Sequence, residues 1–209
     1  MAAESLFALS GISLAGFALL GYAFGCIPCS YLASRILGHI DIRDFGSGNT
    51  GATNVYRVLG KKAGIIAFIG DFLKGLLPAL IGNAIAGQEA GAVAALFAVI
   101  GHCYPATLKF KGGKGVATSA GMIFGTAPLI GVILIILQFS ILFVTRYMSL
   151  ASIISAALFP VLVYFSAPTP VYQLASILMG VLVIFRHHTN IRKLLKGEES
   201  KMGSKKNKV

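Results

Sequence analysis

The sequence predicts an all-α integral membrane protein, a compact bundle of seven transmembrane helices. Of the 209 residues, 56% are hydrophobic and only 12% are charged, and the mean hydropathy is +0.81. These values lie well outside the usual range of soluble domains. The apolar residues form long stretches, and nearly all Lys and Arg residues fall in the short segments between them.

Six apolar stretches follow one another along the chain, and a helix needs roughly 20 residues to cross a bilayer core. The stretches occupy residues 11–34, 64–86, 90–104, 116–145, 147–166 and 170–185. The amino-terminal run lacks the basic start of a signal peptide and is too long for one. We therefore expect it to remain in the protein as the first span.

Basic residues are unevenly distributed between these stretches. Lys and Arg are abundant in three polar segments: 35–62, 105–115 and 186–209. They are missing from three other connections: 1–10, 83–91 and 166–171. Because basic loops remain in the cytoplasm, the amino end is predicted to lie outside and the carboxyl end inside.

The stretch 116–145 decides the number of helices. Between the second and third basic segments the number of crossings must be even, yet hydropathy offers three blocks there. The stretch is too long for one ordinary helix, and the GTAP sequence at 125–128 supplies a break. Splitting it gives seven helices and returns Arg146 to the cytoplasmic side. The first half of the stretch 116–145 is short, so the alternative is that it forms a re-entrant or tilted piece. The fallback is then a protein with five crossings.

One membrane domain is predicted for residues 1–196, followed by a basic cytoplasmic tail, 197–209, that is expected to be disordered. The net charge of +11 is not arranged as a stripe with interleaved aromatic residues, which argues against a nucleic-acid partner. Anionic lipid and phosphorylated substrates fit the clustered cations better.

The first polar segment contains GSGNTGATNVYR, residues 46–57, which is small, flexible and polar. Glycines let the backbone approach a ligand, while hydroxyl and amide side chains add hydrogen-bond donors. A phosphate suits this set, although the spacing matches no nucleotide-binding loop. A flexible loop that caps a helix start is an equally good explanation. The candidate residues are Gly46, Ser47, Gly48, Asn49, Thr53, Asn54 and Arg57.

The second polar segment, GHCYPATLKFKGGKGVATS, ends where an apolar helix is predicted to begin. Amides at a helix N-terminus attract anions and lysines add charge, so KGGKG is typical of a phosphate cradle. An ordinary basic turn would account for the lysines but not for the glycines. The candidates are Lys109, Lys111, Gly112, Gly113, Lys114, Gly115 and Thr118. His102 is either a substrate contact or, as is commoner at a helix end, structural.

The third polar segment begins with RHHTNIRKLLKG. On a helix, His187 and Asn190 share a face at a spacing of three, as do Arg186 and Asn190 at a spacing of four. His188 points elsewhere. A histidine held by an asparagine can accept a proton or orient a hydroxyl near neutral pH. The alternative is a basic helix at the membrane surface.

Two smaller features fit the same picture. In GDFLKG, Asp71 and Lys74 lie three residues apart inside an apolar stretch, where ionisable groups are costly unless paired or functional. Lys74 is a candidate substrate contact, and a structural ion pair is at least as good an explanation. In RYMSLAS, Ser149 and Ser152 could offer hydroxyls to an anion at a helix start, or simply cap the helix.

Together these motifs resemble the bacterial acyl-phosphate:glycerol-3-phosphate acyltransferases, the PlsY family, in order and spacing over nearly the whole chain. The resemblance implies a multi-pass enzyme of the cell inner membrane whose active site faces the cytoplasm. It would transfer a fatty acyl group from acyl phosphate to glycerol 3-phosphate, the first step of phospholipid synthesis. The residues that it implies around the glycerol phosphate and the reacting carbonyl are Ser47, Arg57, Lys114, His187 and Asn190. The KGGKG glycines and Ser149 would hold the acyl-phosphate head.

The expected partners are therefore acyl phosphate, glycerol 3-phosphate and membrane lipid, and the chain is expected to act as a monomer without metal or cofactor. Because acyl phosphate is already activated, the protein mainly has to position the hydroxyl and neutralise the phosphates. The hydroxyl proton would pass to substrate phosphate or to His187.

Two other functions fit the sequence less well. A transporter or flippase for a phosphorylated solute would place basic residues at the membrane midplane, whereas the clusters here lie at one face. A CDP-alcohol phosphotransferase would need clustered aspartates to hold metal ions. The acidic residues between residue 40 and the tail are too scattered for that: Asp41, Asp44, Asp71 and Glu89.

Overall fold

The computed structural model describes residues 11–166 and 168–203, and the regular structure in that part of the chain is helical throughout. The helices are α1 (Gly11–Gly25), α2 (Cys29–Gly38), η1 (Ile42–Asp44), α3 (Ala52–Leu59), α4 (Lys61–Cys103), η2 (Ala106–Leu108), α5 (Val116–Thr126), α6 (Pro128–Thr145), α7 (Met148–Phe165), α8 (Pro170–Arg186) and α9 (His188–Leu195). The predicted all-α class is confirmed. The predicted segment 1–10 and the end of the tail, 204–209, lie outside the described residues.

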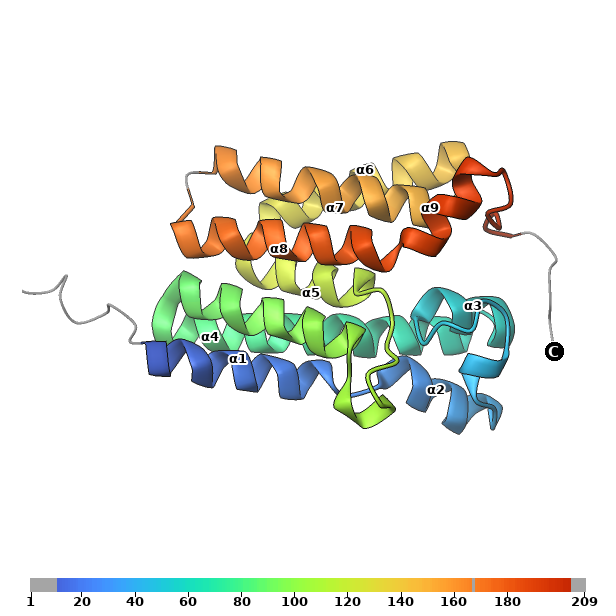
Figure 1. Cartoon of the computed structure of the whole chain (residues 1–209), viewed down its shortest axis with the longest axis horizontal. Coiled ribbons are helices and arrows are strands. Elements are labelled where there is room, and N and C mark those ends of the chain that lie inside the picture. Colours follow the sequence, from blue (N-terminus) through green and yellow to red (C-terminus); the bar gives the residue numbers. More distant parts are fainter. Residues whose placement is uncertain (1–10, 167, 204–209) are drawn as a thin grey trace, which may run out of the picture.

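The long helices lie side by side along one axis (Figure 1). Helices α1 and α4 form one side of the bundle, and α6, α7 and α8 form the other, with the short α5 between them. Helices α2, α3 and α9 gather at one end, as does the segment between η2 and α5. The three basic segments that the sequence separates therefore meet at one end of the bundle, which we call the polar end.

Helix α4 is two helices joined by a turn rather than one rod. Ala86 and Gly87 depart from helical geometry, and Gly87 has a φ of +78°, which favours glycine. The two arms run back along each other (Figure 1). They correspond to the separate apolar stretches 64–86 and 90–104 of the sequence. The break predicted in GTAP is also present, because α5 ends at Thr126 and α6 begins at Pro128.

The first apolar stretch is one candidate membrane span, Ser13–Gly38, as the sequence suggested. Its helix is interrupted at Ile27 and Pro28, which separate α1 from α2. Proline lacks a backbone N–H and disfavours the helical conformation of the residue before it, so the helix ends there. At the interruption the Ile27 carbonyl oxygen accepts hydrogen bonds from Lys74 Nζ at 2.8 Å and from the Cys29 backbone N–H at 3.0 Å.

Glycines let α5 lie directly against α4. A Cβ on Gly75 would be 2.0 Å from the Thr118 carbonyl oxygen, and one on Gly121 would be 2.0 Å from the Phe72 carbonyl oxygen. Real Cβ atoms do not approach so closely, so only glycine fits at these two positions. This contact fixes the depth at which α5 begins, and hence the position of its N-terminus at the polar end.

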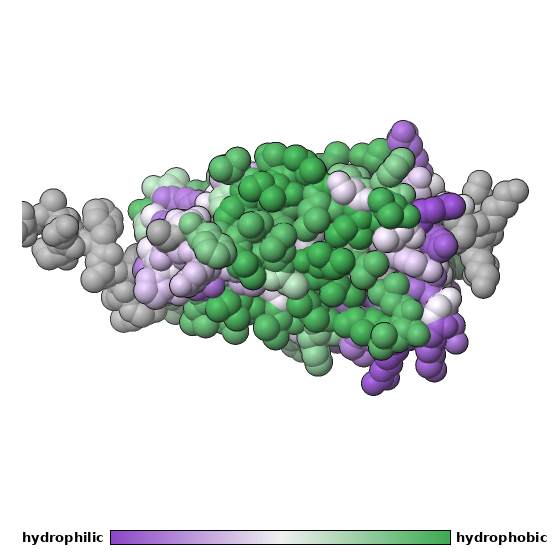
Figure 2. Space-filling view, turned by 90° about the horizontal axis from the view of Figure 1, so that it is seen from above, coloured by the Kyte–Doolittle hydropathy of each residue, from purple (hydrophilic) through white to green (hydrophobic). Residues whose placement is uncertain are grey.

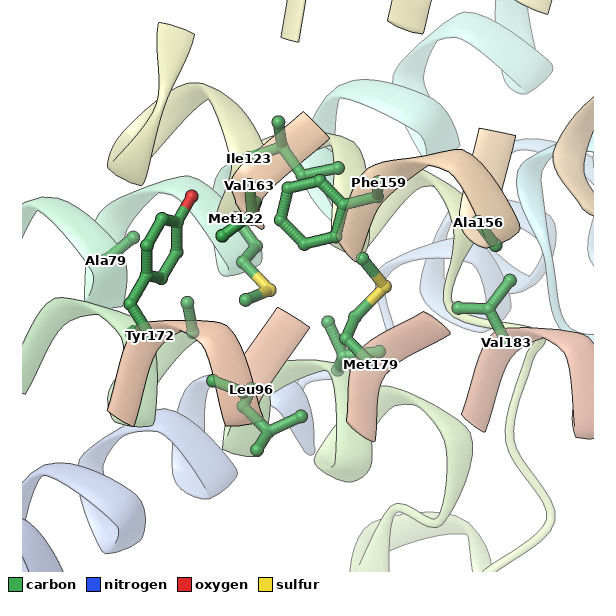
Figure 3. Packing of buried hydrophobic residues seen from close by; sticks show 14 of the residues in the cluster. Ala79, Leu96, Met122, Ile123, Ala156, Phe159, Val163, Tyr172, Met179 and Val183 are labelled. Carbon is green, nitrogen blue, oxygen red and sulfur yellow. The ribbon is translucent and has the colours of Figure 1, made fainter. Parts of the chain in front are cut away.

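The main apolar core lies among α4, α5, α6, α7 and α8. In Figure 3 the ring of Phe159 lies among Met122, Ile123, Val163 and Met179. The outer surface is also apolar, and Figure 2 shows a broad hydrophobic band with polar residues gathered toward its ends. Four helical segments in the described residues are long and apolar enough to span a membrane, or five if the bent pair of α8 and α9 is one span.

Candidate active site

A cavity of about 270 Å³ opens among the motifs at the polar end. Its mouth is lined by side chains from α3, from the segment before α5 and from the α8–α9 junction, while its deeper walls come from α5, α6, α7 and α8. The predicted residues that line it are Ser47, Asn49, Thr53, Asn54, Arg57, His102, Lys114, Gly115, Ser149, Ser152, His187 and Asn190.

Asn54 organises the first motif. Its Nδ2 donates to three carbonyl oxygens, those of Ile42 at 3.2 Å, Phe45 at 3.0 Å and Asn49 at 3.1 Å. Its Oδ1 accepts from the Ser47 backbone N–H at 2.9 Å. All of its polar atoms are therefore engaged within the loop. We infer that Asn54 shapes the site, whereas the sequence suggested a substrate contact.

The glycines of this loop form its turns. Gly46 and Gly48 have φ values of +62° and +70°, which favour glycine, and neither lines the cavity. These turns present Ser47 and Asn49 to the cavity. Arg57, in the last turn of α3, lines it as well. Burial lowers the pKa of Arg57 from its ordinary value.

Arg186 holds the second motif from behind. Its Nε donates to the Gly113 carbonyl oxygen at 3.0 Å, and its Nη2 donates to that of Gly112 at 2.9 Å. Its guanidinium carbon lies 4.9 Å from the centre of the Tyr104 ring, a cation–π contact. The sequence predicted that Arg186 converges with His187 and Asn190 on substrate. The structure instead directs its guanidinium to the glycine backbone, away from the cavity lining.

Of the three lysines in the second motif, only Lys114 lines the cavity. Lys109 and Lys111 are exposed on the outer surface of the polar end. Lys114 Nζ donates to Asn190 Oδ1, and burial lowers the pKa of Lys114 to about 8. Gly115 caps α5 with a φ of +85° and also lines the cavity. The N-terminus of α5 is thus beside a cation, an arrangement that favours an anion.

Thr118 and Ser119 differ in their relation to the cavity. Thr118 is fully buried and is absent from the cavity wall, so the predicted contact with substrate is not supported by its position. Ser119, which the sequence analysis did not single out, lines the cavity, and its buried Oγ has no hydrogen-bond partner within the described residues. Its serine hydroxyl is therefore available to a ligand at the start of α5.

His187 lies at the bend between α8 and α9, and only 3% of it is exposed. Its Nδ1 is 2.7 Å from the Val183 carbonyl oxygen, which can only accept a hydrogen bond. Nδ1 therefore carries the proton, and Nε2 is left as the acceptor of a neutral ring. Burial lowers the pKa of His187 to about 4, so the ring is neutral at pH 7. The predicted support of His187 by Asn190 is replaced by support from Val183.

Asn190 joins the second and third motifs. Its Oδ1 accepts from Lys114, and its Nδ2 donates to Glu199 Oε1 at 2.7 Å. The same Glu199 oxygen accepts from Ser149 Oγ at 2.8 Å. Glu199 is 9% exposed and lines the cavity, although the sequence analysis assigned it to the tail. No local pattern marks this residue as part of a site, because its partners are far from it in the sequence.

The segment that carries Glu199 is held across the polar end. Arg57 Nη2 donates to the Ser200 carbonyl oxygen at 3.3 Å. Two hydrogen bonds join Arg146 and Met202: the Met202 backbone N–H donates to the Arg146 carbonyl oxygen at 2.8 Å, and Arg146 Nη2 donates to the Met202 carbonyl oxygen at 3.0 Å. These bonds hold in place the segment from which Glu199 reaches the cavity wall.

A buried ionic cluster supports the site from below. Asp71 Oδ1 is 2.8 Å from Lys74 Nζ and 3.5 Å from His102 Nδ1, and Asp71 Oδ2 accepts from Ser30 Oγ at 2.5 Å. Lys74 does not line the main cavity, so its contacts favour the structural alternative. His102 lies at the cavity wall and packs under Gly113.

Within the described ranges, no group of three or more His, Cys, Asp and Glu residues is placed where it could hold a metal ion.

Comparison with known proteins places this geometry in a family. The family model described as glycerol-3-phosphate acyltransferase matches residues 15–197. The chain is 48% identical over 187 residues to a glycerol-3-phosphate acyltransferase of Syntrophotalea carbinolica, covering 88% of this chain and 94% of the relative. It is 44% identical over 189 residues to one of Macrococcus caseolyticus, covering 90% and 96%.

Solved structures agree with the sequence relatives. Crystal structures of PlsY, an integral membrane glycerol 3-phosphate acyltransferase, are similar to this chain in a glycerol 3-phosphate form and a lysophosphatidic acid form. Both have a TM-score of 0.85 and cover 92% of this chain and 96% of the solved chain, at 37% and 36% identity. The resemblance inferred from the motifs is confirmed: this chain belongs to the glycerol-3-phosphate acyltransferase family.

Proposed function

We propose that this protein transfers a fatty acyl group from acyl phosphate to glycerol 3-phosphate, producing 1-acylglycerol 3-phosphate and inorganic phosphate. The observation that carries the proposal is a single cavity with two kinds of wall. At its mouth the cations Arg57 and Lys114 and the α5 N-terminus outnumber one carboxylate, Glu199, while α5, α6, α7 and α8 make its depth apolar. Such a cavity suits a phosphate joined to an acyl chain, with a second phosphate beside it.

In the proposed reaction, a glycerol hydroxyl oxygen attacks the acyl carbonyl carbon. A new carbon–oxygen bond forms, the bond from the carbonyl carbon to the phosphate oxygen breaks, and phosphate leaves with the bonding electrons. Lys114 and the free amides of α5 offset the negative charge that develops. The hydroxyl proton passes either to a substrate phosphate oxygen or to Nε2 of His187, which is unprotonated in the neutral ring.

The direct test is phosphate release from acyl phosphate in detergent, without added divalent ion or coenzyme A. Release should require glycerol 3-phosphate and should match the lysophosphatidic acid formed. Phosphate release that is independent of glycerol 3-phosphate, or that yields no acylated glycerol phosphate, would refute the proposal.

The role of His187 and Asn190 is tested by replacing each with alanine. If His187 accepts the proton, His187→Ala should lower kcat much more than it raises KM for glycerol 3-phosphate. Asn190→Ala should lower kcat by releasing Lys114. Wild-type turnover in His187→Ala would assign the proton to substrate phosphate instead.

A transporter for a phosphorylated solute was the other candidate. The basic segments gather with α2, α3 and α9 at one end of the bundle (Figure 1), and the chain belongs to a family of acyltransferases. Neither observation favours transport.

We further propose seven crossings, formed by α1, the two arms of α4, and α5 to α8. Supporting this are the turn at Ala86 and Gly87, the break before Pro128, and the meeting of the three basic segments at one end. The polar end then faces the cytoplasm, the amino end lies outside and the protein acts as a monomer in the inner membrane. The folded domain extends past residue 196 to include Glu199.

Labelling of single cysteines in a cysteine-free background tests this topology. Lys109→Cys should react with an impermeant reagent only from the cytoplasmic side, and Gln88→Cys, which is exposed beside the turn of α4, only from the outside. Labelling of both from one side would refute the orientation.

A further inference from the structure

Below its cationic mouth the cavity continues as an apolar passage. Its walls there include Ile123 of α5, Leu134 of α6, Ala156 of α7 and Met179 of α8. Given the proposed function, this is the part of the cavity that receives the acyl chain. Where the passage stops determines how many carbons it can bury.

On the side of α7 and α8 the passage stops early. Ala156 and Met179 belong to its wall, but Phe159, one turn deeper on α7, does not. The Phe159 ring is fully buried, and it packs with Met122 and Val163 (Figure 3). A chain cannot pass this ring without displacing the close-packed core.

On the side of α5 and α6 the passage goes deeper. Its wall includes Phe124, near the end of α5, and Gly131, in the first turn of α6. A Cβ on Gly131 would lie 3.0 Å from Cε2 and 3.1 Å from Cδ2 of Phe124. The Phe124 ring is in turn 5.9 Å, centre to centre, from that of Phe72. Gly131 therefore lies directly against the Phe124 ring, and any larger side chain at residue 131 would crowd the end of the passage.

The depth of the passage follows from helix geometry. Gln138 bridges α6 to α7 by accepting from Ser155 Oγ at 3.0 Å and donating to Ser152 Oγ at 3.2 Å, which fixes the relative heights of the two helices. Gln138 of α6 is thus level with the part of α7 between Ser152 and Ser155. Ser149, at the mouth, lies four to five residues from this level toward the polar end, and Gly131 lies seven residues from it in the opposite direction. At about 1.5 Å per residue the passage is about 17 Å deep.

We propose that Phe124 and Gly131 form the end of the acyl-chain passage and set the preferred length of the acyl phosphate at about 14 carbons. An extended chain advances about 1.25 Å per carbon, from bonds of about 1.5 Å and angles near 111°. A chain of this length reaches from the mouth to the Phe124 ring. A longer chain has to bend back or leave the passage.

The test measures kcat/KM for acyl phosphates with chains of about 10 to 18 carbons. Gly131→Leu fills the end of the passage, so it should lower the ratio of kcat/KM for long over short chains by about tenfold or more. Phe124→Ala opens the end and should move the preference toward longer chains. Val132→Leu is the matched control, because Val132 is on the same turn of α6 but faces outward, 46% exposed. It should keep the wild-type profile.

The outcomes separate the inference from the proposed function. Wild-type chain-length profiles in both Gly131→Leu and Phe124→Ala would overturn the inference and leave the acyl transfer intact. If Gly131→Leu is inactive with every chain, Phe124→Ala decides, since an unchanged profile in that variant refutes the inference and a shift to longer chains upholds it. A wild-type protein that uses no acyl phosphate of any length refutes the proposed function, and the inference falls with it.

Discussion

Gly112→Ala tests whether the second motif is positioned as tightly as the structure indicates. A Cβ at residue 112 would lie 2.1 Å from the His102 carbonyl oxygen and 2.4 Å from Cδ of Pro105. Neither neighbour is the end of a flexible side chain. The backbone at residue 112 must therefore move, and it carries Lys114 two residues further along.

The size of the effect follows from these distances. Ordinary contacts begin at about 3.4 Å, so the backbone has to shift by roughly 1 Å. A misplacement of about 1 Å in a catalytic group can lower the rate by about 100-fold. Crowding of this kind in a packed region costs about 1–3 kcal/mol of stability. We expect a loss of about 100-fold in kcat/KM with a folded, less stable protein.

The assay is phosphate release that depends on glycerol 3-phosphate, together with the melting temperature in detergent. Gly16→Ala is the matched control, because a Cβ there meets nothing within 4 Å. Gly16→Ala should keep wild-type activity, since it adds the same methyl group at a position where that group displaces no neighbouring atom. Activity of Gly112→Ala within about threefold of Gly16→Ala would contradict the argument that a 1 Å displacement is damaging.

Three further predictions concern the charged and amide groups of the site. Because burial lowers the pKa of Lys114 to about 8, its charge is lost above that pH; kcat/KM for glycerol 3-phosphate should fall through pH 8, and Lys114→Arg should move this limb upward. Glu199 raises the pKa of Lys114, so Glu199→Gln should move the same limb to lower pH, and an unmoved limb would exclude the coupling. Asn54→Ala leaves the Ser47 amide and three carbonyls without their partner; it should raise KM for glycerol 3-phosphate about tenfold and lower the melting temperature, with stability losses of about 1–3 kcal/mol per buried unsatisfied group. An unchanged KM would show that the loop does not depend on Asn54.

The sequence by itself determined the helical class, the breaks near residues 86 and 127, and the clustering of cations in three segments. These features depend on local properties: apolar stretches exclude water, and proline and glycine interrupt helices wherever they fall. The same local patterns identified Ser47, Arg57, Lys114, His187 and Asn190, all of which line the cavity.

Only the tertiary structure decided what each polar atom contacts. Arg186 and Asn54 have the residue types of ligand contacts, yet their donors are engaged by nearby carbonyls. Glu199 lies in a polar, lysine-rich stretch that is typical of a disordered tail, yet its carboxylate accepts hydrogen bonds from Ser149 and Asn190 at the cavity. The reason is that a side chain's partner depends on which helices pack together and at what height. Close contacts such as that of Gly75 with α5 fix these heights, and they join residues that lie far apart in the chain.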